Sequence, residues 1–104
     1  MVTFRVKSLQ GLGKIRGLIG PKKASPVYFK THFGIHTFGL KFPIDVLILD
    51  SGNQIVRLVK ELSPNHVFIW PVIYNRVIEL PTGTISQNNL KIGDKMKLIF
   101  LNSD

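Results

Sequence analysis

The chain has 104 residues, of which 44% are hydrophobic and 19% are charged, and it contains no cysteine. A chain of this length can bury one core, so we expect a single domain over residues 1–104. The composition excludes a disordered protein, and the lack of cysteine excludes disulfides, iron–sulfur clusters and thiol nucleophiles. No apolar run approaches the ~20 residues of a membrane span, and the alternating N-terminal residues do not resemble a signal peptide. We therefore expect a soluble, cytoplasmic protein without a membrane partner.

The formal net charge is +8, and all of the excess positive charge lies in residues 1–41, which hold eight basic residues and no acidic one. Residues 42–104 hold six of each kind. A cationic surface concentrates polyanions and speeds their capture, so one hypothesis is weak binding of nucleic acid or another polyanion. The other hypothesis is a solvated, lysine-rich surface, because segregation along the chain does not establish a surface patch. The candidate polyanion-binding residues are Lys14, Arg16, Lys22, Lys23, Lys30 and Lys41.

Alternating and continuous apolar runs, separated by glycine and proline, predict β-strands. In chain order we expect a strand at 2–7, a long ordered loop at 8–26 with one helical turn near 14–18, strands at 27–30, 44–49, 54–60, 67–70 and 72–80, a short helix at 84–89, and a strand at 95–101. Closing or stacking such a sheet protects its edges. The fold class is therefore mainly β: a small barrel or sandwich of about six or seven mostly antiparallel strands with one short helix.

Local turn chemistry supports these boundaries. Asp50 can accept hydrogen bonds from its own turn, and Gly52 can adopt positive φ, so residues 50–53 are expected to form a hairpin turn. Asp94 is expected to act in the same way beside Gly93. Thr84 is the expected N-cap of the short helix.

Four blocks of sequence occur in a characteristic order. They are Gly17-Leu18-Ile19, Pro43-Ile44-Asp45 running into Asp50-Ser51-Gly52, Val77-Ile78-Glu79-Leu80-Pro81-Thr82-Gly83, and Leu90-Lys91-Ile92-Gly93-Asp94. Together they resemble a known prokaryotic family, domain of unknown function 192. Two features differ from many members: residues 36–41 replace an aromatic-Met-Lys-Asn segment, and no signal peptide is evident. The resemblance implies a small, mostly β fold, but it supplies no activity, substrate or catalytic set.

The strand at 44–49 is apolar on both faces except at Asp45, so we expect it to be buried at the centre of the fold. Asp45 is the most informative polar residue, because it is the only charge in this strand. A carboxylate in a core must be hydrogen-bonded, paired or placed at a cavity. It could bind a ligand or act as an acid or base, or it could organise the loop at residues 32–42. His32 and His36 with Asp45 could in principle form a two-histidine, one-carboxylate metal site, but Gly34 and Gly39 argue against the helix that would align the histidines. We therefore expect neither a metal nor another cofactor.

The residues provide no recognisable catalytic set. No serine lies in a nucleophile elbow, and the glycine-rich segment 11–17 matches neither a dinucleotide fingerprint nor a Walker loop. The sequence favours a non-catalytic binding module for an unknown small ligand or protein partner. We expect its site near the Asp45 strand, where the loops from His32 to Lys41 and from Ser63 to Trp70 converge. The candidate ligand-binding residues are His32, His36, Asp45, His66 and Trp70. The alternatives are the polyanion binder and a hydrolase that uses Asp45 with His32 or His36.

Overall fold

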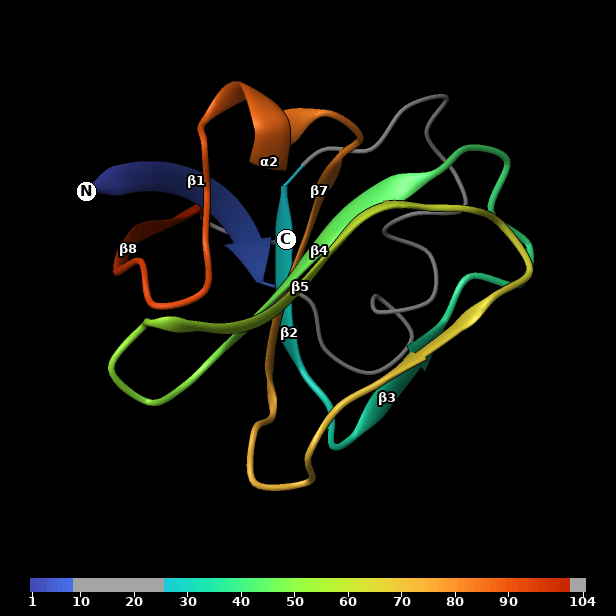
Figure 1. The fold of residues 1–104 in the computed structure, drawn as a ribbon, viewed down its shortest axis with the longest axis horizontal. Coiled ribbons are helices and arrows are strands. Elements are labelled where there is room, and N and C mark those ends of the chain that lie inside the picture. Colours follow the sequence, from blue (N-terminus) through green and yellow to red (C-terminus); the bar gives the residue numbers. More distant parts are fainter. Residues whose placement is uncertain (9–25, 102–104) are drawn as a thin grey trace.

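The computed structural model describes residues 1–8 and 26–101, and this part of the chain is mainly β, as predicted (Figure 1). The predicted loop at 8–26, with its helical turn, lies almost entirely outside the described residues. Eight strands and one short helix follow one another in the described residues. They are β1 (Val2–Ser8), β2 (Val27–Lys30), β3 (Gly34–His36), β4 (Ile44–Leu49), β5 (Ile55–Leu62), β6 (Val67–Ile69), β7 (Arg76–Pro81), α2 (Thr84–Gln87) and β8 (Met96–Leu101). No described helix has the length and apolar character needed to cross a membrane.

Six of these strands form one sheet in the order β5-β4-β7-β2-β1-β8, and β3 pairs with β6 in a separate two-stranded ribbon. β1 runs parallel to both β2 and β8, whereas the other described pairs are antiparallel. The edge strands β5 and β8 approach each other at an isolated bridge between Gln54 and Lys95. The sheet is therefore strongly curved but not closed into a barrel, and the fold is sandwich-like.

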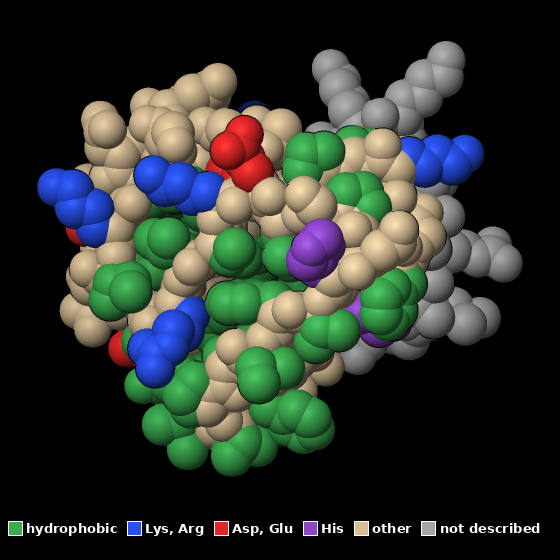
Figure 2. All heavy atoms as spheres, turned by 45° about the vertical axis from the view of Figure 1, so that its right-hand side comes forward, with side chains coloured by type: hydrophobic (Ala, Val, Ile, Leu, Met, Phe, Trp, Pro, Cys, Tyr) green, Lys and Arg blue, Asp and Glu red, His purple; other side chains and the backbone are tan. Residues whose placement is uncertain are grey.

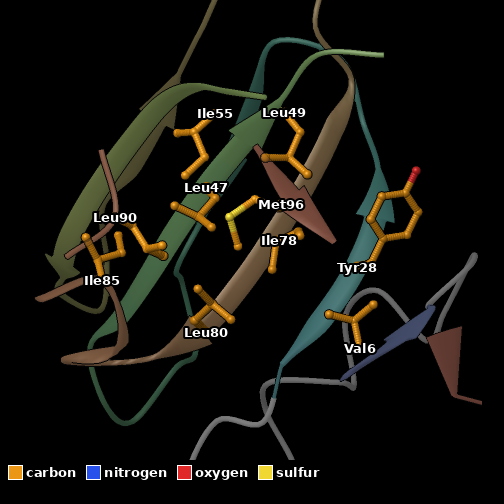
Figure 3. Close-up of a cluster of buried hydrophobic side chains, with 10 residues drawn as sticks. All are labelled: Val6, Tyr28, Leu47, Leu49, Ile55, Ile78, Leu80, Ile85, Leu90 and Met96. Carbon is orange, nitrogen blue, oxygen red and sulfur yellow. The ribbon is translucent and has the colours of Figure 1, made fainter. Parts of the chain in front are cut away.

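β4 lies inside the sheet, and all six of its residues are buried. Because successive side chains of a strand point to opposite faces, β4 contributes to two cores. Leu47 and Leu49 join the helix-side core, which α2 covers with Ile85 (Figure 3). Ile44, Val46 and Ile48 join the ribbon-side core, which includes Trp70. Burial of each such side chain contributes about 1.5–3 kcal/mol, so the continuous apolar run of β4 largely determines where the sheet forms.

The short ribbon is where the predicted elements differ most from the structure. β3 was not predicted, because three residues with a leading glycine give no clear local signal. It exists through pairing with β6, in the register of Gly34 with Ile69 and His36 with Val67. The strand predicted at 72–80 begins only at Arg76, because the preceding residues form a turn closed by a hydrogen bond from the Tyr74 N–H to the Pro71 carbonyl.

The turns show which local expectations were right. The Asp50 carboxylate accepts the N–H groups of Gly52 and Gln54, as expected, but positive φ falls on Asn53 and not on Gly52. Thr84 is not the N-cap of α2. That position is Gly83, with φ of 91°, and the Thr84 hydroxyl donates to the Pro81 carbonyl instead.

Candidate functional site

Asp45 is fully buried, and both of its carboxylate oxygens accept backbone hydrogen bonds. Oδ1 accepts the Glu61 N–H at 2.9 Å, and Oδ2 accepts the Ile85 N–H at 2.8 Å. These bonds tie β4 to the end of β5 and to the first turn of α2. A charged acceptor that satisfies two amides explains how the core tolerates this carboxylate. The geometry matches the structural role considered for Asp45, although the loop that it organises is not the one at residues 32–42.

The three histidines lie away from Asp45. Strand alternation directs Asp45 to the helix side of the sheet, whereas the ribbon that carries His36 packs on the opposite side, against the core that includes Ile44 and Val46. The structure therefore does not assemble the pair of Asp45 and a histidine that hydrolysis would require. The described residues also contain no group of three or more histidine and acidic side chains that could hold a metal ion.

Each histidine is exposed, and its Nδ1 lies within hydrogen-bond distance of a backbone group. His32 Nδ1 lies 3.4 Å from the Val72 carbonyl, and His66 Nδ1 lies 2.9 Å from the Pro64 carbonyl. His36 Nδ1 accepts the Phe38 N–H, and the two rings stack with their centroids 4.9 Å apart. The histidines thus line the ribbon and its two loops without meeting at one point.

The loops at residues 32–41 and 63–70 do converge, and Thr37 joins them. Its side chain is fully buried, its Oγ1 donates to the Ser63 carbonyl at 2.7 Å, and the same atom accepts the His66 N–H at 2.8 Å. The Thr37 backbone adds bonds from its N–H to the His66 carbonyl and from the Asn65 N–H to its own carbonyl. Sequence reasoning did not single out Thr37, although a threonine in an aromatic loop is a plausible signal for such a bridge.

Trp70 supports this region from beneath and is not an exposed platform. It is only 5% exposed, and its indole N–H donates to the Tyr74 carbonyl at 2.7 Å. Phe68, from the inward face of β6, packs near it with ring centroids 5.7 Å apart. The turn after β6 is therefore attached to the ribbon-side core.

The solvent side of the same region carries large exposed hydrophobic side chains. We call this group of exposed side chains the ribbon surface. In Figure 2, hydrophobic side chains gather over the centre and the lower part of the face shown, and histidines lie on the same face. The members are 52–77% exposed, and the group consists of Phe33, Phe38, Val67, Ile69, Val72 and Ile73. Val67 and Ile69 point outward because β6 alternates and places Phe68 inward.

The predicted polyanion-binding residues are only partly placed. Lys30 and Lys41 are exposed, whereas Lys14, Arg16, Lys22 and Lys23 lie outside the described residues. Binding of a polyanion through the basic segment therefore stays a prediction.

Two buried or half-buried charged residues on β7 emerge only from the structure. The guanidinium of Arg76 donates to the Tyr28 hydroxyl, to the Asp50 carbonyl and to the Asn53 side chain, so it clamps the turn between β4 and β5. Glu79 is 2% exposed between its cross-strand neighbours Val27 and Val46. Its Oε1 accepts no hydrogen bond from the described residues, and burial raises the pKa of Glu79 from 4.5 to about 8.

Comparison with known proteins agrees with the fold and with the resemblance seen in the sequence. The family model of domain of unknown function 192, described as "Uncharacterized ACR, COG1430", matches residues 21–98. The chain belongs to this family. No match was found among curated proteins.

Two solved structures are similar to the chain. One is a protein of unknown function from Novosphingobium aromaticivorans, with a TM-score of 0.72 and 13% identity, covering 89% of this chain and 71% of that one. The other is described as a "putative transcription regulator" from Sinorhizobium meliloti, with a TM-score of 0.73 and 16% identity, covering 89% of this chain and 78% of that one. At these identities the similarity concerns the fold alone.

Proposed function

We propose that this protein is a non-catalytic binding module, that its binding site is the ribbon surface, and that its ligand is another protein. The observation that carries the proposal is the clustering of six large, exposed hydrophobic side chains on one short ribbon and its two adjoining turns. Single exposed hydrophobic residues are ordinary, but a contiguous group of them marks an interaction site.

The support beneath the surface fits this role. Ile35 and Phe68 pack into the ribbon-side core, and Thr37 and Trp70 fasten the two loops. Two short strands alone are marginally stable, so these anchors hold the exposed side chains in place before a partner arrives. Such preorganisation lowers the entropic cost of binding.

A protein partner fits the surface better than a small ligand. The cavity beside Ile73, lined also by Tyr74 and Arg76, has a volume of about 170 Å³. Ligand pockets usually have at least ~300 Å³ and enclose most of the ligand, whereas protein interfaces are flatter with an apolar centre. The histidine candidates retain a role as polar groups at the margin of the apolar surface.

The test is a selection from a random 12-residue peptide display library against the full chain. Ribbon-dependent binders are those that bind the wild type but lose at least about tenfold in affinity for a variant with Ile69→Ser and Ile73→Ser, since two exposed apolar anchors contribute on this scale. These side chains are 70% and 77% exposed, so the fold should tolerate their replacement.

The matched control carries Ile92→Ser and Ile99→Ser, which are 62% and 42% exposed and lie outside the ribbon. We expect it to bind the selected peptides like the wild type. If the selection yields no ribbon-dependent binders, or if the control variant loses binding equally, the ribbon surface is not the binding site.

A further inference from the structure

We infer that the partner binds by strand addition, so that an extended segment of the partner protein pairs with the free edge of β6. The inference rests on the proposed function, because it assumes that the ribbon surface is the site, and it specifies how a partner occupies that site. It is carried by the main chain of β6, whose outward-directed N–H and C=O groups form no hydrogen bond with the described residues.

The hydrogen bonds of the ribbon show which way each main-chain group of β6 points. The Trp70 N–H donates to the Phe33 carbonyl of the facing chain at 3.0 Å. In an antiparallel pair, every second residue directs its N–H and C=O toward the neighbouring strand, so Phe68 also faces β3 in this way. Val67 and Ile69 therefore direct their N–H and C=O groups away from β3.

The edge of β6 that faces away from β3 is free in the described part of the chain. Among residues 1–8 and 26–101, β6 pairs with β3 alone, in a ribbon separate from the six-stranded sheet (Figure 1). No hydrogen bond within these residues engages the main chain of Val67 or Ile69. The edge thus offers two donors and two acceptors at residues two positions apart. An extended main chain matches this spacing, and such main-chain bonds provide the affinity in β-strand addition.

The side chains at this edge leave the main chain accessible. Val67 and Ile69 are 61% and 70% exposed, so the outer face of the edge is open to solvent. Ile69 lies opposite Gly34 in the ribbon, and a Cβ on that glycine would lie 3.3 Å from Ile69 Cγ2. The Ile69 side chain therefore reaches toward β3, away from the free edge. An added strand would place every second side chain beside Val67 and Ile69, on the apolar outer face.

The opposite edge of the ribbon is less suited to a partner strand. The Gly34 N–H of β3 donates to the His32 carbonyl at 2.7 Å, so this donor is already engaged. The residue between them, Phe33, has a φ of 51°, which takes the chain out of the extended conformation directly before β3. The free edge of β6 is therefore the one assigned to the partner.

A scan of the strongest ribbon-dependent peptide from the library tests the mode of binding. Each peptide amide is replaced in turn by its N-methyl amide, and affinity is measured by fluorescence anisotropy. An added strand donates to its neighbour only at every second residue, so N-methylation at alternate positions should weaken binding at least about threefold and should change it little at the positions between. Any pattern without this period of two overturns the inference and leaves the binding function intact. An absence of ribbon-dependent peptides removes the proposed function itself, so the two failures can be told apart.

Hydrogen exchange at saturating peptide locates the new bonds on the protein. We expect the Val67 and Ile69 N–H groups to exchange at least about tenfold more slowly in the complex, because they gain acceptors there. The Trp70 N–H, which the Phe33 carbonyl already accepts, is the internal control and should change much less. Unchanged exchange at Val67 and Ile69 overturns the inference.

A pair of substitutions at one residue separates the main chain from the side chain. Val67→Pro removes a donor of the free edge, and Val67→Ala removes most of the same side chain but keeps the donor. Proline is tolerated on an edge strand where its nitrogen faces solvent, and urea unfolding checks that both variants fold. We expect Val67→Pro to bind the peptide at least about threefold more weakly than Val67→Ala, and equal affinities overturn the inference.

Sedimentation of the unliganded protein tests the main competing occupant. We expect a monomer at micromolar concentration. A dimer that Val67→Pro abolishes and Val67→Ala retains would assign the free edge of β6 to a second copy of the chain and overturn the inference.

Discussion

Glu79 provides the sharpest physical prediction, because burial holds its carboxyl group protonated in the folded protein. Replacing it with glutamine removes the titration while preserving shape. In the folded state its pKa is about 8, against an ordinary value of 4.5. Between pH 4.5 and about 8, Glu79 holds a proton in the folded protein that it has released in the unfolded chain. The free energy of unfolding that depends on neutral Glu79 is therefore fully present below about pH 4.5 and is lost as the pH rises through about 8.

The magnitude follows from the change in pKa. At about 1.4 kcal/mol per pKa unit, a pKa difference from 4.5 to about 8 corresponds to about 5 kcal/mol. A domain of this size is typically stable by only about 5–15 kcal/mol, so the wild type should lose a large part of its stability between pH 5 and 8.5. Glu79→Gln should be equal or somewhat less stable at pH 5, because its amide is also buried, and clearly more stable at pH 8.5.

Urea unfolding of both proteins at half-unit pH steps measures this difference. Subtracting the variant from the wild type cancels the histidines and every other titrating group that the two proteins share. Glu61→Gln is the matched control, because that side chain is exposed on the same sheet, and its difference from the wild type should stay nearly flat. A flat difference for Glu79→Gln across pH 5–8.5 would refute the argument that desolvation dominates at this residue.

Two further substitutions test the polar groups that organise the fold. Asp45→Asn should destabilise the protein by about 2–4 kcal/mol in urea unfolding, because the asparagine NH2 group replaces one of the two oxygens that accept backbone N–H groups. Asp50→Asn should cost less than about 1 kcal/mol, since Oδ1 of Asp50 accepts both of its hydrogen bonds and asparagine keeps that oxygen. Stability of Asp45→Asn equal to the wild type would contradict the double-acceptor role. Thr37→Val should cost about 1–3 kcal/mol and speed hydrogen exchange at residues 63–66, whereas Thr3→Val, at an exposed position of β1, should do neither. Unchanged exchange in that loop would show that the hydroxyl does not hold it.

Sequence patterns predicted the features that depend on neighbouring residues. The apolar run at 44–49 predicted a buried central strand, and the alternation of Val2, Phe4 and Val6 predicted β1. The Asp50 turn followed from side-chain chemistry within four residues. The sequence also showed that a buried Asp45 carboxylate needs hydrogen-bond donors. It did not show which donors these are, and the structure supplies the backbone N–H groups of Glu61 and Ile85.

The candidate site could be predicted only in part, because it depends on contacts between distant segments. The convergence of the loops at 32–41 and 63–70 was anticipated, but the histidines and Asp45 were placed together although the sheet separates them. β3 was missed because its three residues become a strand only beside β6, about thirty positions later. From the sequence, the candidate Trp70 could be either an exposed platform or a core residue, and the structure buries it beneath the exposed residues around it.

The sequence by itself determined the mainly β class, the central position of β4 and the chemistry of its turns, because period-two alternation and turn propensity are local properties. The tertiary structure decided which residues share a face. It placed Glu79 between valines of two other strands and turned Val67 and Ile69 outward. The physical reason is that the desolvation of a side chain depends on everything nearby in space, most of which is distant along the chain.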